Sequence, residues 1–243
     1  MVRSKLVMFS LNPNLTQQAF RIGNEQTPVF VVDDFMLNYS GAIDEAIKIS
    51  YASDKESVGA YYPGIRAPVG TEYGMSLLRH TQAIFYKIFQ VPNQLTLYPQ
   101  NGSYSLITKQ EKEMDSLQCI PHFDNNNTFS FAMLHYLNDG DFGGTGFYRH
   151  KPTGFENITE GRKAEYLESA QQYMATHGNP KKSYFTESTD HYELIHKIDY
   201  KPNRLVIYPA TILHSAFIDN PQHDVCTNPK TGRLSANFFI EFK

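Results

Sequence analysis

The sequence predicts a mainly β protein with flanking helices, of the α+β class. Beyond Pro92, short apolar and β-branched runs are separated by turn-forming residues, at the spacing typical of a β-sandwich or barrel. A double-sheet jelly roll is one form of this arrangement. Before Pro92, two segments show the periodicity of amphipathic helices. With 243 residues the chain has the length of one domain, and we expect a single domain over residues 1–243.

The first ninety residues are expected to hold one strand and two helices. PVFVV at 28–32 is β-branched and aromatic and predicts a buried strand. The two amphipathic segments, at 37–51 and 75–91, predict helices, the second of which is ended by Pro92. The six Gly and Pro residues in 52–74 predict a long loop between them.

The remainder of the chain is expected to consist of short strands with one helical insertion. The insertion covers 151–190, where good helix formers over 160–177 predict a surface helix that ends at Gly178. The expected strands are 95–98, 103–108, 117–120, 128–137, 143–148, 192–198, 204–208, 213–218 and 233–242.

Composition excludes several classes of function. A formal charge of -3 and a pI of about 6.3 argue against a protein that binds nucleic acid or an anionic membrane. The chain lacks an apolar run of membrane-spanning length and a signal-peptide core near its N-terminus. Its two cysteines have neither CxxC spacing nor a disulfide pattern. We therefore expect a cytoplasmic protein with reduced thiols.

One stretch carries the chemistry, the segment PHFD at 121–124. His122 and Asp124 are two residues apart, so on a strand both side chains would point to the same face. His214, in YPATILHSA, is the candidate for a third ligand. Two histidines and one carboxylate on one side of a metal form the facial triad of non-haem Fe(II) oxygenases. Taken alone, the HxD pair is equally compatible with a hydrogen-bonded surface pair.

The motifs HFD, YLND, GGTGFY, RLVIYPATILHS and GRLSANFFIEF follow one another in this order. Together they resemble the core of the Fe(II)/2-oxoglutarate-dependent oxygenase superfamily, and most closely its prolyl-hydroxylase-like branch. VFVVDDFM is similar to the strand that opens that branch. The resemblance covers roughly residues 28–51 and 117–242 and extends to a bacterial subgroup that shares the PHFD core.

The resemblance implies a double-stranded β-helix, a jelly-roll core of cupin-like form with the N-terminal helices packed on one sheet. It implies that His122, Asp124 and His214 bind Fe(II) and form the catalytic centre. The implied reaction uses O2 and 2-oxoglutarate, releases succinate and CO2, and hydroxylates a C–H bond. The implied substrate is an amino acid, a peptide side chain or another small polar molecule. Since Asp124 is present, hydroxylation is favoured over halogenation.

The resemblance also implies the binding site of the cosubstrate. Arg233 matches the basic residue that binds the distal carboxylate of 2-oxoglutarate, and an arginine fork fits a carboxylate bidentately. Ser235 and Tyr136 are the expected additional hydroxyl donors, although Tyr136 also fits a plain core position. Arg233 follows His214 by 19 positions, a longer gap than is usual in the family, which predicts a lengthened hairpin between them. If Arg233 does not bind the carboxylate, Arg204 is the next candidate.

Two other functions remain open at this point. The first is a metal- or small-ligand-binding jelly roll of cupin type without turnover, and the second is an interaction module with a decayed oxygenase core. The sequence leaves open the substrate, the oligomeric state, and whether segments 52–74 and 151–190 form a lid. Arg66, within 52–74, could contact substrate or form an ordinary ion pair.

Overall fold

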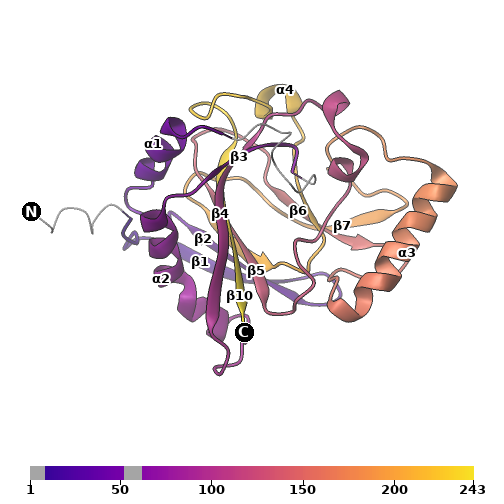
Figure 1. The fold of residues 1–243 in the computed structure, drawn as a ribbon, viewed down its shortest axis with the longest axis horizontal. Coiled ribbons are helices and arrows are strands. Elements are labelled where there is room, and N and C mark those ends of the chain that lie inside the picture. The colour runs from indigo at the N-terminus through magenta and orange to yellow at the C-terminus, as the bar shows by residue number, and fades with distance from the viewer. Residues whose placement is uncertain (1–8, 52–61) are drawn as a thin grey trace, which may run out of the picture.

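The computed structural model describes residues 9–51 and 62–243 and contains two antiparallel sheets with helices on both sides (Figure 1). In spatial order, the seven strands that these residues contribute to the larger sheet are β1 (Thr16–Ile22), β2 (Thr27–Asp33), β8 (Leu205–Pro209), β5 (Ser130–Tyr136), β10 (Leu234–Phe242), β4 (Leu97–Ile107) and β3 (Gly64–Pro68). The smaller sheet contains β7 (Tyr192–Ile198), β6 (Thr145–His150) and β9 (His214–Ala216). The prediction of a mainly β protein with helices is confirmed.

Beyond β4 the chain passes back and forth between the two sheets. β5, β8 and β10 belong to the larger sheet, whereas β6, β7 and β9 belong to the smaller one. Residue 122, between β4 and β5, forms a bridge to β9 of the smaller sheet. This alternation places segments that are distant in sequence, such as 121–124 and 213–216, next to each other.

The central strand β5 is buried on both faces because each face of the larger sheet is covered. Phe131 and Met133 belong to the core cluster that the helices share. Ala132, Leu134 and Tyr136 belong to a second cluster, together with residues of the smaller sheet. Alternate side chains of a strand point to opposite faces, so one strand contributes to both cores. Such strands read as continuous apolar runs rather than as alternating ones.

Two N-terminal helices pack against the larger sheet. They are α1 (Ser40–Lys48) and α2 (Thr71–Lys87), and both lie on the side of the molecule near β1, β2 and β4 (Figure 1). Their buried apolar residues join strand residues in one cluster, to which they contribute Ala42, Ala46, Tyr73, Leu77 and Phe85. The opposite face of the sheet is thereby left to the smaller sheet and to the site.

The inserted helix α3 (Glu160–His177) lies on the other side of the molecule, near β6 and β7 (Figure 1). It ends at Gly178, which has a φ of +85°, a conformation that glycine adopts without the steric cost of a Cβ. The helix predicted at 160–177 is therefore confirmed. A further helical turn, α4 (Pro221–Asp224), lies between β9 and β10.

Several local predictions were wrong. Residues 117–120 do not form a strand, because Ser116–Cys119 is a 3-10 helix held by a capping box of Asp115 and Gln118. The strands predicted at 95–98 and 103–108 are one strand, β4. The loop predicted at 52–74 contains β3 and the start of α2, while its residues 52–61 lie outside the described residues. Strand β1 was not predicted. Among the described helices, none is long and apolar enough to cross a membrane.

Candidate metal centre

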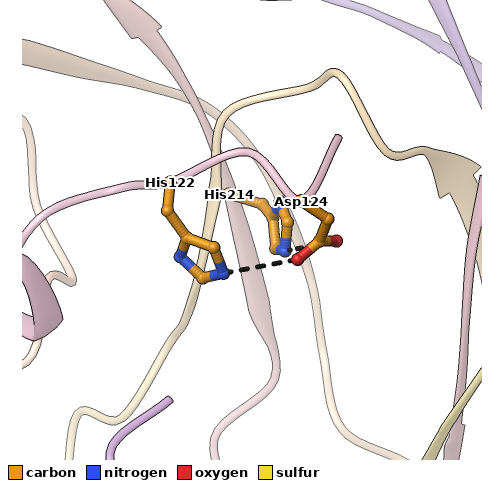
Figure 2. A group of neighbouring side chains, drawn as sticks. All are labelled: His122, Asp124 and His214. Atoms are coloured by element: carbon orange, nitrogen blue, oxygen red, sulfur yellow. Dashed lines mark ion pairs between the residues drawn. The ribbon is translucent and has the colours of Figure 1, made fainter. Parts of the chain in front are cut away.

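His122, Asp124 and His214 come together at one edge of the smaller sheet, as the sequence predicts. One ligand-type atom from each lies within 4.8 Å of the others, and the three side chains point toward one another (Figure 2). Nε2 of His122 lies 3.7 Å from Oδ1 of Asp124, and Nε2 of His214 lies 3.5 Å from Oδ2. Two imidazoles and a carboxylate in this arrangement can hold a divalent transition metal.

The backbone around these residues differs from the prediction of a strand. His122 forms only an isolated antiparallel bridge with His214, in which each N–H donates to the other residue's carbonyl at 2.9 and 2.8 Å. The Asp124 N–H donates to the carbonyl of Ala210 at 2.8 Å. Backbone bonds to one short segment, residues 210–214, therefore fix all three side chains.

The histidines carry the features of neutral metal ligands. Nδ1 of His214 lies 2.9 Å from the carbonyl of Ile212; when Nδ1 donates, Nε2 is left as the acceptor that faces Asp124. Burial lowers the pKa of His122 well below its usual value, and His214 and Arg66 lower it further. Burial raises the pKa of Asp124, against the opposing effects of His214 and Arg66. The side chains of His122 and Asp124 retain 22% and 17% exposure, so the centre is open on one side.

A cavity leads from these three residues into the space between the two sheets. We call it the inner cavity. Every second residue of the segment 233–239 lines it, because Leu234, Ala236 and Phe238 point to the helix-covered face instead. Polar side chains on its wall include Tyr62, Arg66, Thr145, Tyr184, Ser215, Arg233, Ser235 and Asn237.

Arg233 is buried in the inner cavity, with 2% of its surface exposed. Its Nε and Nη2 donate to the carbonyls of Gly143 and Gly144 at 2.5 and 2.8 Å. The rings of Tyr136 and Tyr200 lie 5.4 and 5.8 Å from its guanidinium carbon. Among the described residues, no carboxylate lies within ion-pair distance of Arg233. A buried cation without a counterion is costly, and an anionic ligand would supply the missing charge.

The neighbours that hold Arg233 were not identified as functional from the sequence. Gly143 and Gly144 have no room for a side chain, since a Cβ on either would lie 1.9 Å from the carbonyl oxygen of Phe217 or Ile198. Asn138 donates to the carbonyls of Pro229 and Gly232 and so fixes the chain just before Arg233. These residues belong to the motifs YLND and GGTGFY, for which the sequence analysis assigns a role only to Tyr136.

Ser235 and Tyr136 lie opposite each other on β10 and β5. The Ser235 hydroxyl is buried on the wall of the inner cavity and makes no hydrogen bond of ordinary geometry with the described residues. The Tyr136 hydroxyl instead bonds the hydroxyl of Thr145 at 2.8 Å, and Thr145 lines the cavity. The Ser235 hydroxyl therefore lies at the site itself, near the Tyr62 side chain, whereas Tyr136 reaches the site through Thr145.

Two expectations about the Arg233 region need correction. The lengthened segment after His214 is not a hairpin, since β9 and β10 belong to different sheets and the segment crosses between them. The pairing of β10 with β5 nevertheless runs without a shift from Ser235 to Glu241. The second candidate, Arg204, is bound elsewhere, with Nε and Nη2 at 2.6 and 3.0 Å from the carboxylate of Asp33.

The chain is similar to several solved structures and matches one family model. The HygX protein of Streptomyces hygroscopicus, in a structure with nickel and 2-oxoglutarate bound, is similar at 12% identity and a TM-score of 0.45, over 89% of this chain and 84% of that one. An N-substituted L-amino acid dioxygenase from Burkholderia ambifaria AMMD is similar at 10% identity and a TM-score of 0.41, over 93% of each chain. No curated protein matches the chain. The model of a family of unknown function, DUF6445, matches residues 13–240, and the chain belongs to that family.

Proposed function

We propose that this member of the DUF6445 family is an Fe(II)- and 2-oxoglutarate-dependent dioxygenase of the prolyl-hydroxylase-like branch. It would hydroxylate a C–H bond of an amino acid, a peptide side chain or another small polar substrate. In this proposal residues 1–243 are one domain with a double-stranded β-helix core. The strand order supports that core, because the chain crosses between the two antiparallel sheets four times from β5 to β10.

One observation carries the proposal. A cluster of two histidines and one aspartate opens into a cavity that also contains a buried arginine with no carboxylate partner among the described residues. The first feature fits a divalent metal and the second fits an anion. A 2-oxo acid whose other end is a carboxylate satisfies both at once.

The residues present fit these groups. His122, Asp124 and His214 would hold Fe(II), and Arg233, helped by Ser235, would bind the distal carboxylate of 2-oxoglutarate. When bound, Fe(II) supplies the redox chemistry that couples O2 and 2-oxoglutarate to C–H oxidation. His122, Asp124 and His214 would supply three ligands, and the remaining positions of the ion would be available to the cosubstrate and O2.

The protein's own contribution is position and shielding. The carbonyls of Gly143 and Gly144 fix the Arg233 guanidinium in one orientation, so its remaining N–H groups are directed before the cosubstrate arrives. The reciprocal backbone bridge between His122 and His214 fixes the spacing of the ligands. Burial of Arg233 and Ser235 keeps water from the carboxylate, which strengthens every electrostatic contact there.

Anaerobic titration of the metal-free protein with Fe(II) and then 2-oxoglutarate tests the proposal. We expect a visible metal-to-ligand charge-transfer band in the wild type and none in His214→Ala. In Arg233→Met, the band should require a much higher concentration of 2-oxoglutarate. Metal binding by the wild type without a band would contradict the proposal and favour a metal-holding jelly roll without turnover.

A further inference from the structure

A second hollow lies on the exposed side of His122 and Asp124. We call it the outer groove, and its volume is about 330 Å³, a size that suits a small molecule. Its polar rim is formed by Arg66 on β3, Gln100 and Asn101 on β4, and Asn125 beside the aspartate ligand. His122, Asp124, Tyr62 and Arg66 line both the outer groove and the inner cavity. A molecule in the outer groove would therefore lie against the open side of the metal centre.

Arg66 is the cation of the outer groove, and it forms no ion pair within the described part of the chain; Asp124 is near enough to interact with its charge but is assigned above to the metal. Its Nε is buried and has no hydrogen-bond partner there. None of the described carboxylates lies within ion-pair distance of it. Its guanidinium carbon lies 4.7 Å from the centre of the Tyr62 ring, a contact that positions the cation without compensating its charge. The pairing of Arg66 with Ser105 on β4 fixes the backbone beneath it.

Two arginines without an ion-pair partner among the described residues therefore lie near the metal centre, Arg233 in the inner cavity alone and Arg66 on the wall that the inner cavity shares with the outer groove. Arg233 in the inner cavity is assigned above to the cosubstrate. Arg66 lines the outer groove beside Tyr62 and the candidate ligands His122 and Asp124, so its guanidinium is placed to bind a second ligand there. The side chains of the rim indicate the chemical class of this ligand. One guanidinium and three carboxamides suit a monoanion that also carries neutral polar groups.

We infer that Arg66 binds a carboxylate of the substrate, and that the substrate is a small carboxylic acid such as an amino acid, an N-acylated amino acid or the C-terminal residue of a peptide. Gln100, Asn101 and Asn125 would bind its amide or hydroxyl groups. The planar fork of arginine binds a carboxylate through two parallel hydrogen bonds, which a lysine cannot reproduce. A phosphate dianion would be expected to recruit more than one cation. This inference rests on the proposed function and specifies its substrate.

Binding of matched probe pairs tests the inference without turnover. Calorimetry is run on protein loaded with Mn(II) and 2-oxoglutarate, with N-acetyl-L-amino acids and the corresponding N-acetyl-L-amino acid amides as probes. N-acetyl-O-phosphoserine amide serves as the phosphate arm. We expect at least one acid to bind roughly ten-fold or more tightly than its amide, since a hydrogen-bonded charge pair is lost in the amide.

The variants assign that preference to one side chain. Arg66→Gln should weaken binding of the preferred acid by about 10- to 100-fold, and Arg66→Lys should give an intermediate loss. Arg79→Gln, the same change at an exposed position on α2, should bind as the wild type does. Affinity for 2-oxoglutarate should change less than about three-fold in Arg66→Gln, in contrast to Arg233→Met.

Five outcomes would overturn the inference. Acids and amides that bind equally, or no acid binding up to roughly 10 mM, would exclude a carboxylate site in the groove. Preference for the phosphate probe would replace the carboxylate with a phosphate. A loss of 2-oxoglutarate affinity in Arg66→Gln as large as in Arg233→Met would assign Arg66 to the cosubstrate. If the wild type itself fails to bind 2-oxoglutarate, the proposed function fails, and this inference fails with it.

Discussion

Two arginines in this molecule, one half-buried and one buried, have opposite surroundings. Arg149 on β6 donates through Nε and Nη2 to the carboxylate of Glu156, at 2.9 and 2.6 Å, and through Nη1 to Glu193 at 2.7 Å. Glu156 is fully buried and also accepts the backbone N–H groups of Asn24 and Glu25. Arg233 is more deeply buried, with 2% of its surface exposed against 17% of the Arg149 side chain, and its protein acceptors are two backbone carbonyls.

The difference separates a structural role from a binding role. The charges of Arg149 and Glu156 compensate each other, so this pair needs no ligand. Through Glu156 it also joins the N-terminal turn at 23–25 to the smaller sheet. An unpaired buried cation lowers stability unless something else neutralises it. Its presence in the cavity that also contains the candidate metal ligands supports the proposal that a ligand brings the counter-charge. The same comparison separates Arg204, which is paired with Asp33, from Arg66, which has no such partner among the described residues.

The largest effect on the free energy of unfolding is expected from breaking the ion pair between Arg149 and Glu156. Arg149→Ala leaves the fully buried carboxylate of Glu156 without its cation, and we expect a loss of about 3 to 5 kcal/mol in the free energy of unfolding. Urea denaturation measures it. Glu193→Gln removes the other partner of Arg149. Because the Glu193 side chain is 42% exposed, this change should lower the free energy of unfolding by at most about 1 kcal/mol. Equal losses in the two variants would show that burial of the partner does not distinguish them.

Breaking the unpaired site should affect binding rather than stability. We expect Arg233→Met to weaken 2-oxoglutarate binding by about 100-fold, or about 2.7 kcal/mol, because a bidentate charged contact is lost. In the ligand-free protein the free energy of unfolding should change by less than about 1 kcal/mol or rise, since a buried unpaired charge is removed. A large loss of stability without loss of binding would make Arg233 a structural residue like Arg149.

Ligand-induced stabilisation connects the two measurements. Mn(II) with 2-oxoglutarate at about 100 times its dissociation constant should raise the free energy of unfolding of the wild type by about 2.7 kcal/mol. Glu193→Gln should retain the full increment, whereas Arg233→Met and His214→Ala should lose most of it at the same concentrations. An increment that persists in both site variants would place the ligand somewhere other than the inner cavity.

The sequence predicted the elements whose signals are local. The helix at 160–177 and the strand at 192–198 have the predicted bounds, because helix formers followed by Gly178 and alternation between turns are read directly. The spacing of Arg233 and Ser235 correctly placed both on one face of a strand, since side-chain direction has a period of two.

What the sequence did not predict depends on contacts between distant segments. The Gly and Pro residues around β3 predicted a loop, whereas the segment forms a strand because β4 pairs with it. The position of Arg66 on β3 therefore could not be predicted from the sequence. The bridge between His122 and His214 likewise exists only once the two sheets come together. That no carboxylate of the described residues lies within ion-pair distance of Arg233 depends on all the segments around it, and no motif encodes it.

The smallest effect is expected at Asn138, which positions the segment before Arg233 and is not itself proposed to bind the ligand. Asn138 is buried and donates to the carbonyls of Pro229 and Gly232, the residue that precedes Arg233. Asn138→Ala leaves both carbonyls without this donor and should cost about 1 to 2 kcal/mol in the free energy of unfolding. Since the segment that orients Arg233 becomes looser, affinity for 2-oxoglutarate should fall by a few-fold, roughly 1 kcal/mol. Metal affinity should stay unchanged, because the backbone of the three candidate ligands is held separately, by the bridge between His122 and His214 and by the Asp124 bond to Ala210. Calorimetry with Mn(II) alone and then with 2-oxoglutarate separates the two affinities, and a loss of metal binding in this variant would show that the cavity and the metal centre are one cooperative unit.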